Sequence, residues 1–239
     1  MRKDHRPYFL KQIYLRFQKL YGSHFLKPQL QSLGRGCTFM KPWHVEIFGG
    51  PIHIGEFATI IASADKKVRI SVWPGSPEKG AVHIGNYGML CPGVRISSAD
   101  EIRIGDSCMF ANNAYITDSD WHDIYNRVIT GRTAPVHIAD NVWIGDSVIV
   151  CKGVSIGANS IVGAGAVVTG NIPANAIAAG NPARVVKRLD PEREITTRAH
   201  WFNEPERLFG DFDRYDREML KNNRLLNWLR HLLFPSTTD

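Results

Sequence analysis

Aliphatic residues recur every six positions in the second half of this 239-residue chain, and a small or polar residue follows each of them. No helix has this period, because 3.6 residues per turn would carry successive apolar side chains around the axis. A period of six fits a short strand and a turn, and three such units close one coil of a triangular prism. The longest unbroken run is Ile138, Ile144, Val150, Ile156, Val162 and Val168.

The same phase continues upstream at Ile54, Ile84 and Ile104, but the spacing between these residues exceeds one regular coil. A stacked coil accommodates extra residues only by projecting them outward as loops. We therefore predict a prism over residues 36–189, with outward loops at 63–80 and 119–135.

Apolar residues at helical spacing mark both ends of the chain, at 10–21 and at 225–232, with lysine and arginine interleaved in the first stripe. We expect a basic amphipathic helical arm over residues 1–35. We expect a mostly helical extension over residues 190–239, of which 190–224 is only partly helical.

The formal net charge of +6 is concentrated at the N-terminus, because residues 1–35 hold eight Lys/Arg and one acidic residue, giving 8 − 1 = +7. A protein that coats nucleic acid would spread its cations differently, so nucleic acid is not an expected partner. A local basic arm favours an anionic membrane surface, an acidic patch on the protein's own body, or a role as a cap on the prism end.

Four cysteines, Cys37, Cys91, Cys108 and Cys151, lack CxxC spacing, which argues against a disulfide scaffold and against a zinc finger. No uncharged apolar run reaches the roughly 18–20 residues of a membrane span. The N-terminus has no apolar core typical of a signal peptide. We expect a cytoplasmic protein, with the basic arm as its candidate contact to the inner membrane face.

Three motifs in the regular part of the chain resemble the hexapeptide-repeat acetyltransferases, in the branch of galactoside, maltose, xenobiotic and surface-polysaccharide acetyltransferases. They are Asn-Val-Trp-Ile-Gly at 141–145, Val-Gly-Ala-Gly-Ala-Val-Val-Thr at 162–169 and Ala-Gly-Asn-Pro-Ala-Arg at 179–184. The resemblance implies an all-β fold, a left-handed parallel β-helix. It also implies a homotrimer with acetyl-CoA, the acyl donor, lying in a groove between neighbouring prisms.

His122, in the loop at 119–135, is the candidate general base, and the resemblance places the family's essential histidine in this loop. Imidazole titrates near neutral pH, which suits removal of a hydroxyl proton while the oxygen attacks a thioester carbonyl. Its other ring nitrogen needs a partner that fixes the tautomer. Asp118, Asp120 or a loop carbonyl suits this role.

Small residues along the prism permit close approach of the pantetheine arm of CoA, and cations at its end suit the nucleotide phosphates. Corner packing is the alternative role for the small residues, and a solvated surface is the alternative for the cations. By resemblance, the residues along this path are Trp143, Gly145, Asp146, Ala164 and Thr169. The cations at the end of the prism are Arg184, Lys187 and Arg188.

The resemblance implies transfer to a hydroxyl of a saccharide or glycoconjugate, such as a surface-polysaccharide precursor. Residues 90–93 lack the acceptor-contacting asparagine of the sugar acetyltransferases, which argues against a simple galactoside or maltose. An antibiotic or an amine, including an amino sugar in N-acetyl transfer, is the alternative acceptor. Asn113 is a candidate acceptor contact that equally suits a tight turn. Tyr87, Trp121 and Tyr125 are candidates for stacking on a sugar, and equally suit core packing or loop anchoring.

His53, His83 and His137 precede equivalent repeat positions, as Arg103 does. A histidine column leads to a further alternative, a metal-binding relative of the γ-class carbonic anhydrases or a non-enzymatic prism. Arg103 would place a cation among the ligands, so we expect a solvated column and no metal.

Overall fold

The computed structural model describes residues 4–74 and 79–234. The chain divides into two compact units, one of residues 21–200 and one of residues 1–20 with 201–239.

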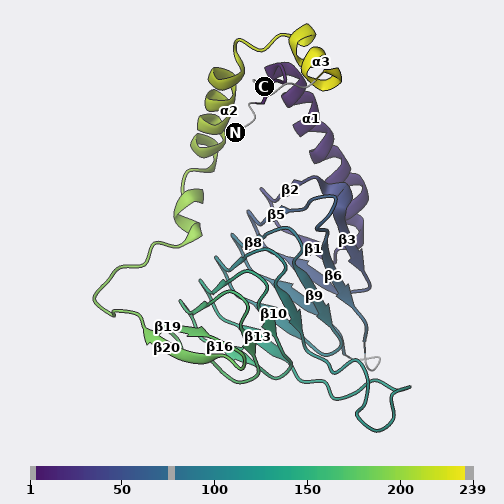
Figure 1. Cartoon of the computed structure of the whole chain (residues 1–239), viewed down its shortest axis with the longest axis vertical. Coiled ribbons are helices and arrows are strands. Elements are labelled where there is room, and N and C mark those ends of the chain that lie inside the picture. Colours follow the sequence, from purple (N-terminus) through teal and green to yellow (C-terminus); the bar gives the residue numbers. More distant parts are fainter. Residues whose placement is uncertain (1–3, 75–78, 235–239) are drawn as a thin grey trace. The chain divides into compact units, whose positions relative to one another are not determined.

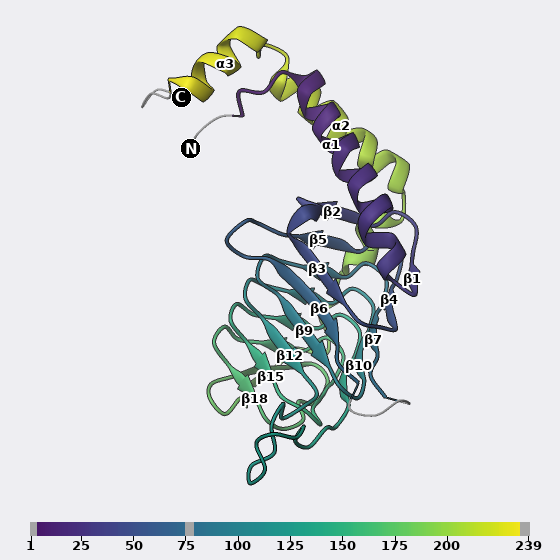
Figure 2. The same cartoon turned by 90° about the vertical axis from the view of Figure 1, so that its right-hand side faces the viewer.

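Three sheets of short strands build the larger unit, and successive strands pass from sheet A to sheet B to sheet C, so that three strands complete one coil (Figures 1 and 2). Sheet A contains β1 (Ser32–Leu33), β4 (Ile52–Ile54), β7 (Val82–Ile84), β10 (Ile102–Ile104), β13 (Val136–Ile138) and β16 (Ser155–Ile156). Sheet B contains β2 (Thr38–Met40), β5 (Thr59–Ile61), β8 (Met89–Leu90), β11 (Met109–Phe110), β14 (Trp143–Ile144), β17 (Ile161–Val162), β19 (Ala176–Ala179) and β20 (Arg184–Arg188). Sheet C contains β3 (Val45–Phe48), β6 (Val68–Val72), β9 (Arg95–Ser98), β12 (Tyr115–Thr117), β15 (Ile149–Val150) and β18 (Val167–Val168).

The repeated aliphatic side chains fill the space that the three sheets enclose. Strands pair in parallel and in register, so that Ile104 stacks on Ile138 and Ile138 on Ile156. All six positions of the longest run, from Ile138 to Val168, are between 0% and 2% exposed. Burial of each such side chain contributes about 1.5–3 kcal/mol. The all-β prism predicted from the six-residue period is confirmed.

The prism has three edges, named A–B, B–C and C–A after the sheets that each edge joins. Turns at the A–B edge place Asn141, Asn159 and Asn175 in left-handed backbone, with φ of 56°, 61° and 55°. Asparagine tolerates this conformation better than most residues. Their amides also form a column of hydrogen bonds of 2.9 Å from coil to coil, which stabilises the stacking.

Strand β6 lies inside the 63–80 segment that the sequence predicts as a loop, so that prediction is wrong for Val68–Val72. β6 pairs in register with β3 and β9 and completes sheet C. Of the remaining predicted loop, residues 75–78 lie outside the described residues. The coil also begins earlier than position 36, because β1 pairs with β4.

The smaller unit is helical. It contains most of α1 (Tyr8–Tyr21) together with α2 (Pro205–Leu220) and α3 (Leu225–Leu233). Because α2 extends over sixteen residues, the 190–224 segment is partly helical, as predicted. Shorter helical turns elsewhere are η1 (Gly22–Leu26), η2 (Lys27–Gln29), η3 (Pro42–His44) and η4 (Arg198–Phe202).

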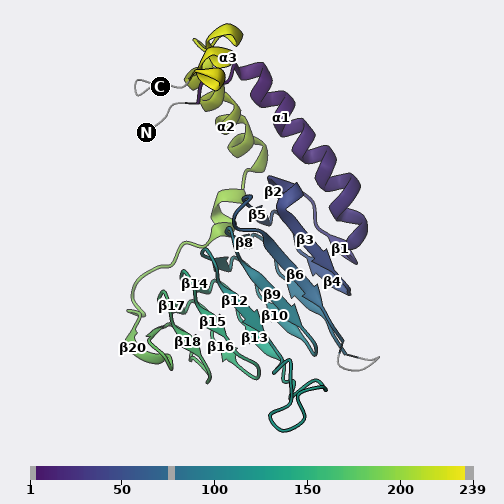
Figure 3. The ribbon, with the colours of Figure 1, turned by 45° about the vertical axis from the view of Figure 1, so that its right-hand side comes forward.

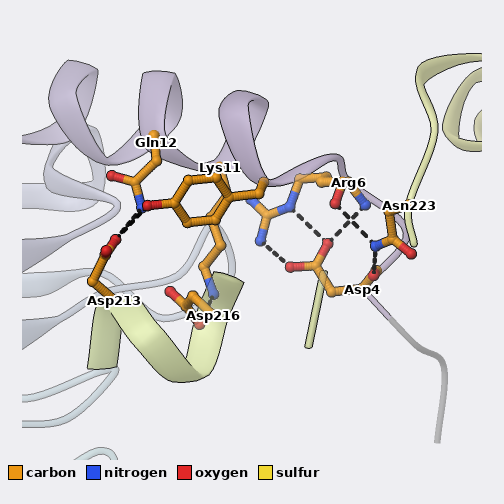
Figure 4. Close-up of polar contacts among 8 residues, drawn as sticks. Asp4, Arg6, Lys11, Gln12, Asp213, Asp216 and Asn223 are labelled. Carbon is orange, nitrogen blue, oxygen red and sulfur yellow. Dashed lines mark hydrogen bonds and ion pairs between the residues drawn. The ribbon is translucent and has the colours of Figure 1, made fainter. Parts of the chain in front are cut away.

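Acidic residues of α2 neutralise part of the basic N-terminal segment (Figure 4). Lys11 forms an ion pair of 2.6 Å with Asp216, and Tyr8 donates a hydrogen bond of 2.6 Å to Asp213. Of the three roles predicted for the basic arm, the structure therefore realises contact with an acidic patch of the protein itself. No helix among the described residues is both long and apolar enough to cross a bilayer.

Candidate functional site

The loop at 119–135 leaves the prism at the C–A edge, between β12 and β13, and projects away from the coils (Figure 3). Backbone hydrogen bonds of 2.9 Å join its two arms, from the Asp120 N–H to the Arg132 carbonyl and from the Gly131 N–H to the Asp120 carbonyl. A Cβ atom on Gly131 would lie 2.3 Å from the Asp120 carbonyl oxygen, so only glycine permits this close approach. The base of the loop is thus a fixed hairpin.

Two side-chain contacts fasten this loop to the prism wall. Lys152, at the C–A edge of the following coil, lies 2.7 Å from the carboxylate of Asp120. The indole N–H of Trp121 lies 3.1 Å from both the Tyr115 hydroxyl and the Thr117 hydroxyl on β12. Trp121 therefore anchors the loop, which was the alternative to sugar stacking.

The Nδ1 atom of His122 lies 2.8 Å from the carbonyl oxygen of Arg127. A carbonyl oxygen only accepts hydrogen bonds, so Nδ1 carries the hydrogen and Nε2 holds the lone pair of the neutral ring. The His122 side chain is exposed. Of the three partners that the sequence allowed, the structure selects the loop carbonyl.

Asp123 shapes the turn that brings this carbonyl to His122. Its carboxylate accepts hydrogen bonds from the N–H groups of Tyr125 and Asn126, at 2.9 Å and 2.8 Å. These backbone bonds lower the pKa of Asp123 and keep the carboxylate charged.

Asp118 does not contact His122, which corrects one of the predicted pairings. Its side chain is fully buried and accepts hydrogen bonds of 2.7–2.9 Å from the Ser98 hydroxyl and from the N–H groups of Ala99 and Asp100. Asp118 thus fixes the preceding coil where the loop begins. The other predicted carboxylate, on Asp120, faces Lys152.

Asp100 connects the two interruptions of the coil at the C–A edge. Its carboxylate lies 2.6 Å from the Lys79 ammonium group and 3.1 Å from the Thr133 hydroxyl. A shallow hollow of about 440 Å³ lies here, between Lys79 and Pro135. His122 is not among its lining residues.

The predicted acceptor contacts are distributed over all three edges. Tyr125 is 93% exposed on the same loop as His122. Asn113 occupies a B–C turn with a φ of 61°, the structural role that the sequence left open. Tyr87 lies at the A–B edge and stacks on Phe57 at 5.9 Å. The structure therefore groups only Trp121 and Tyr125 with His122.

The candidate cofactor residues lie mainly on sheet B and at the B–C edge. Trp143 is 48% exposed on β14, and Ala164 is exposed at the neighbouring turn. Gly145 has a structural role, because a Cβ atom there would lie 2.6 Å from the Val162 carbonyl oxygen. Asp146 accepts a hydrogen bond of 2.6 Å from Ser147. Thr169 differs from the others, because it follows β18 at the C–A edge, as Lys152 follows β15.

The three candidate phosphate-binding cations are exposed on β20, which pairs antiparallel with β19 at the end of the prism. The guanidinium groups of Arg184 and Arg188 lie near the carbonyl oxygens of Ala183 and Ala174, at 2.8 Å and 3.4 Å. Together with Lys187, they leave this strand with cationic side chains directed to solvent.

The histidine column aligns as predicted, with His53, His83, Arg103 and His137 in register on sheet A. The rings of His53 and His83 stack at 4.6 Å. Partial burial, together with the charge of Arg103, lowers the pKa of His83. Arg103 itself pairs with Glu101 at 2.6 Å. Within residues 4–74 and 79–234, no group of three or more His, Cys, Asp or Glu side chains is arranged to hold a metal.

The sequence does not show the role of Lys152, nor that the loop carbonyl beside His122 is that of Arg127. Lys152 stands directly after Cys151 at an ordinary repeat position, so only the stacking of coils shows that it faces the loop. The carbonyl partner depends on loop conformation, for which the only sequence signals are Asp123 and Gly131.

Comparison with known proteins agrees with this architecture. Residues 135–170 match the family model described as bacterial transferase hexapeptide (six repeats). The chain is 34% identical to galactoside O-acetyltransferase of Escherichia coli over 112 residues, which are 46% of this chain and 55% of that protein. A Schizosaccharomyces pombe protein that is named as an acetyltransferase is 53% identical over 58 residues, which are 24% of this chain and 28% of that protein.

Among solved structures, a mutant of AntD, an N-acyltransferase from Bacillus cereus, aligns with a TM-score of 0.55. The alignment covers 80% of this chain and 96% of AntD at 19% identity. These matches confirm the left-handed β-helix, and residues 135–170 match the hexapeptide repeats of this transferase family. The chain spans about half the length of the Escherichia coli relative and less of the Schizosaccharomyces pombe relative.

Proposed function

We propose that this protein is an acetyl-CoA-dependent O-acetyltransferase that modifies a hydroxyl of a saccharide or glycoconjugate, with His122 as the general base. The hydrogen bond from Nδ1 of His122 to the Arg127 carbonyl carries the proposal. It leaves Nε2 available to accept a proton, on a loop that Lys152 and Trp121 fasten to the prism. The relative named galactoside O-acetyltransferase supports transfer of acetyl to a sugar hydroxyl.

In this reaction, Nε2 of His122 removes the hydroxyl proton while the acceptor oxygen attacks the thioester carbonyl carbon. The bond between that carbon and sulfur then breaks, the acetyl ester forms, and CoA leaves as a thiol with the proton from the imidazolium. Positioned general bases contribute about 100- to 10,000-fold to such rates.

Exposed cations on β20 suit the phosphates of CoA, and the solvent-facing Trp143 and Ala164 suit its pantetheine arm. At Gly165 a Cβ atom would meet nothing within 4 Å, so this turn offers open space for the arm. Gly145 contributes by permitting the close stacking of coils.

We infer a homotrimer, because one prism separates the two halves of the proposed site. His122 and Thr169 lie at the C–A edge, whereas Trp143 and Ala164 lie on sheet B and the B–C edge. When the C–A edge of one prism lies against sheet B and the B–C edge of a neighbour, the two halves of the proposed site come together. The test mixes His122→Ala chains with Arg188→Ala chains, which are each inactive alone. In a mixed oligomer, an intact His122 of one chain meets an intact Arg188 of its neighbour, so part of the activity returns. No recovery in mixed oligomers contradicts the shared site.

The compartment we propose is the cytoplasm, because the reaction draws on acetyl-CoA and the four cysteines are free thiols.

The direct test is thiol release from acetyl-CoA with a panel of oligosaccharides, amino sugars and aminoglycosides. His122→Ala lowers turnover at least about 100-fold, whereas His137→Ala, an exposed histidine on β13, leaves it unchanged. Wild-type turnover in His122→Ala refutes the assignment of the base. Transfer only to amines overturns the O-acetyl proposal while leaving the base in place.

A further inference from the structure

Helix α3 carries a continuous apolar stripe. Its leucines stand at positions i, i+1, i+4, i+7 and i+8, a spacing that places all of them on one face of a helix. They are Leu225, Leu226, Leu229, Leu232 and Leu233.

This stripe faces away from the rest of the helical unit. Leu226, Leu232 and Leu233 are 78%, 63% and 67% exposed. The other face makes the contacts, since the ring of His231 stacks on His5 at 3.7 Å and Trp228 is half-buried. An amphipathic helix of a globular unit ordinarily buries its apolar face, so the reversed orientation marks an interaction surface.

Charge distinguishes α3 from α2. Residues 222–234 contain Arg224, Arg230 and no acidic residue. On α2, by contrast, Asp213 and Asp216 pair with the N-terminal segment. A second copy of α3 on this stripe would bring cations against cations with no carboxylate on either helix, which disfavours self-association.

We propose that α3 binds the surface of a bilayer that contains anionic lipids. The leucine stripe enters the boundary between headgroups and acyl chains, and Arg224 and Arg230 lie at the level of the acidic headgroups. Trp228 lies between the apolar stripe and the polar face, where the amphipathic indole ring prefers the membrane interface. Nine residues are too few to span a bilayer, so the helix lies on the surface.

This contact is independent of the proposed acetyl transfer. It also relocates the membrane contact that the sequence suggested for the basic N-terminal arm. Lys11 in that arm forms an ion pair with Asp216, whereas residues 222–234 contain no carboxylate beside Arg224 and Arg230.

The test is flotation of the full-length protein with phosphatidylcholine vesicles, with and without phosphatidylglycerol. Wild-type protein floats with the anionic vesicles, and high salt weakens the association. The double variant L226D/L233D no longer floats, and Arg224→Gln binds about fivefold more weakly. The matched control I124D/V128D adds the same charge at exposed positions of the loop at 119–135, outside the helical unit, and floats like the wild type.

Light scattering on the same samples measures the mass of the assembly and tests the competing occupant of the stripe, a second copy of the chain. Two results overturn the proposal: flotation of L226D/L233D equal to wild type, or absence of wild-type flotation together with a smaller assembly for L226D/L233D. The second result identifies another copy of the chain as the occupant. Unchanged circular dichroism of the variants shows that a loss of flotation reflects the surface and not unfolding.

Discussion

The ammonium nitrogen of Lys152 lies 2.7 Å from Oδ1 of Asp120, and this ion pair joins the base of the His122 loop to the next coil of the prism. The two side chains are 28% and 47% exposed. A pair this exposed contributes only about 0–1 kcal/mol to stability. We therefore expect its importance to lie in the position of the loop.

Lys152→Met lowers kcat about 10-fold, because small displacements of a catalytic group are costly to rate, and leaves the thermal unfolding temperature nearly unchanged. The measurement is steady-state thiol release combined with thermal denaturation. Lys67→Met is the matched control, since Lys67 forms a similarly exposed ion pair with Glu46 on the prism. Equal rates for both variants and the wild type show that the tether has no catalytic effect.

Asp118 and Asp120 differ in what their carboxylates hold. In the wild type, the buried carboxylate of Asp118 accepts hydrogen bonds from the N–H groups of Ala99 and Asp100. Asp118→Asn destabilises the protein by about 2–4 kcal/mol, because the new amide N–H₂ group is a donor and cannot accept from these N–H groups. Asp120→Asn, at the exposed ion pair, changes stability by less than about 1 kcal/mol. Urea unfolding of both variants provides the comparison. Equal unfolding midpoints contradict the structural role of Asp118.

The six-residue period predicts the prism because burial is periodic wherever the coil is regular. From Ile138 to Val168, every sixth residue is in the core. The prediction fails around β6, where the residues between β5 and β6 shift the phase, and the alternation of Val68, Ile70 and Val72 no longer matches the repeat.

The candidate site was predictable only in part. The loop and its histidine follow from an insertion of polar and aromatic residues that the core does not need. The partners depend on stacking: Asp118 reaches the preceding coil and Lys152 reaches back from the following one. Sequence separation conceals such contacts, because each coil has a different length.

We expect Cys108 to be the least reactive of the four thiols, because it alone among them is buried. Burial raises its pKa to about 12. Its thiol donates a hydrogen bond to the Ala139 carbonyl oxygen, with 3.1 Å between sulfur and oxygen. Since thiolate is the nucleophile, we expect iodoacetamide to modify Cys37, Cys91 and Cys151 before Cys108 in the native protein. Mass spectrometry of partly alkylated samples resolves the order. Early alkylation of Cys108 contradicts the burial of this coil.

His83 makes stability depend on pH. Burial, and then the charge of Arg103, hold its folded-state pKa below the ordinary value of 6.5. The unfolded chain therefore binds a proton at a higher pH than the folded chain, so stability is complete above about pH 7 and falls as the pH drops through 6.5 toward the folded-state pKa. We expect His83→Gln to reduce this loss, and Arg103→Gln to reduce it partly by removing the neighbouring cation. Urea midpoints between about pH 7.5 and 5 give the stability difference, and proton NMR of the His83 ring gives the pKa itself. A His83 resonance that titrates at or above the ordinary value, or parallel pH profiles for wild type and His83→Gln, refutes this coupling.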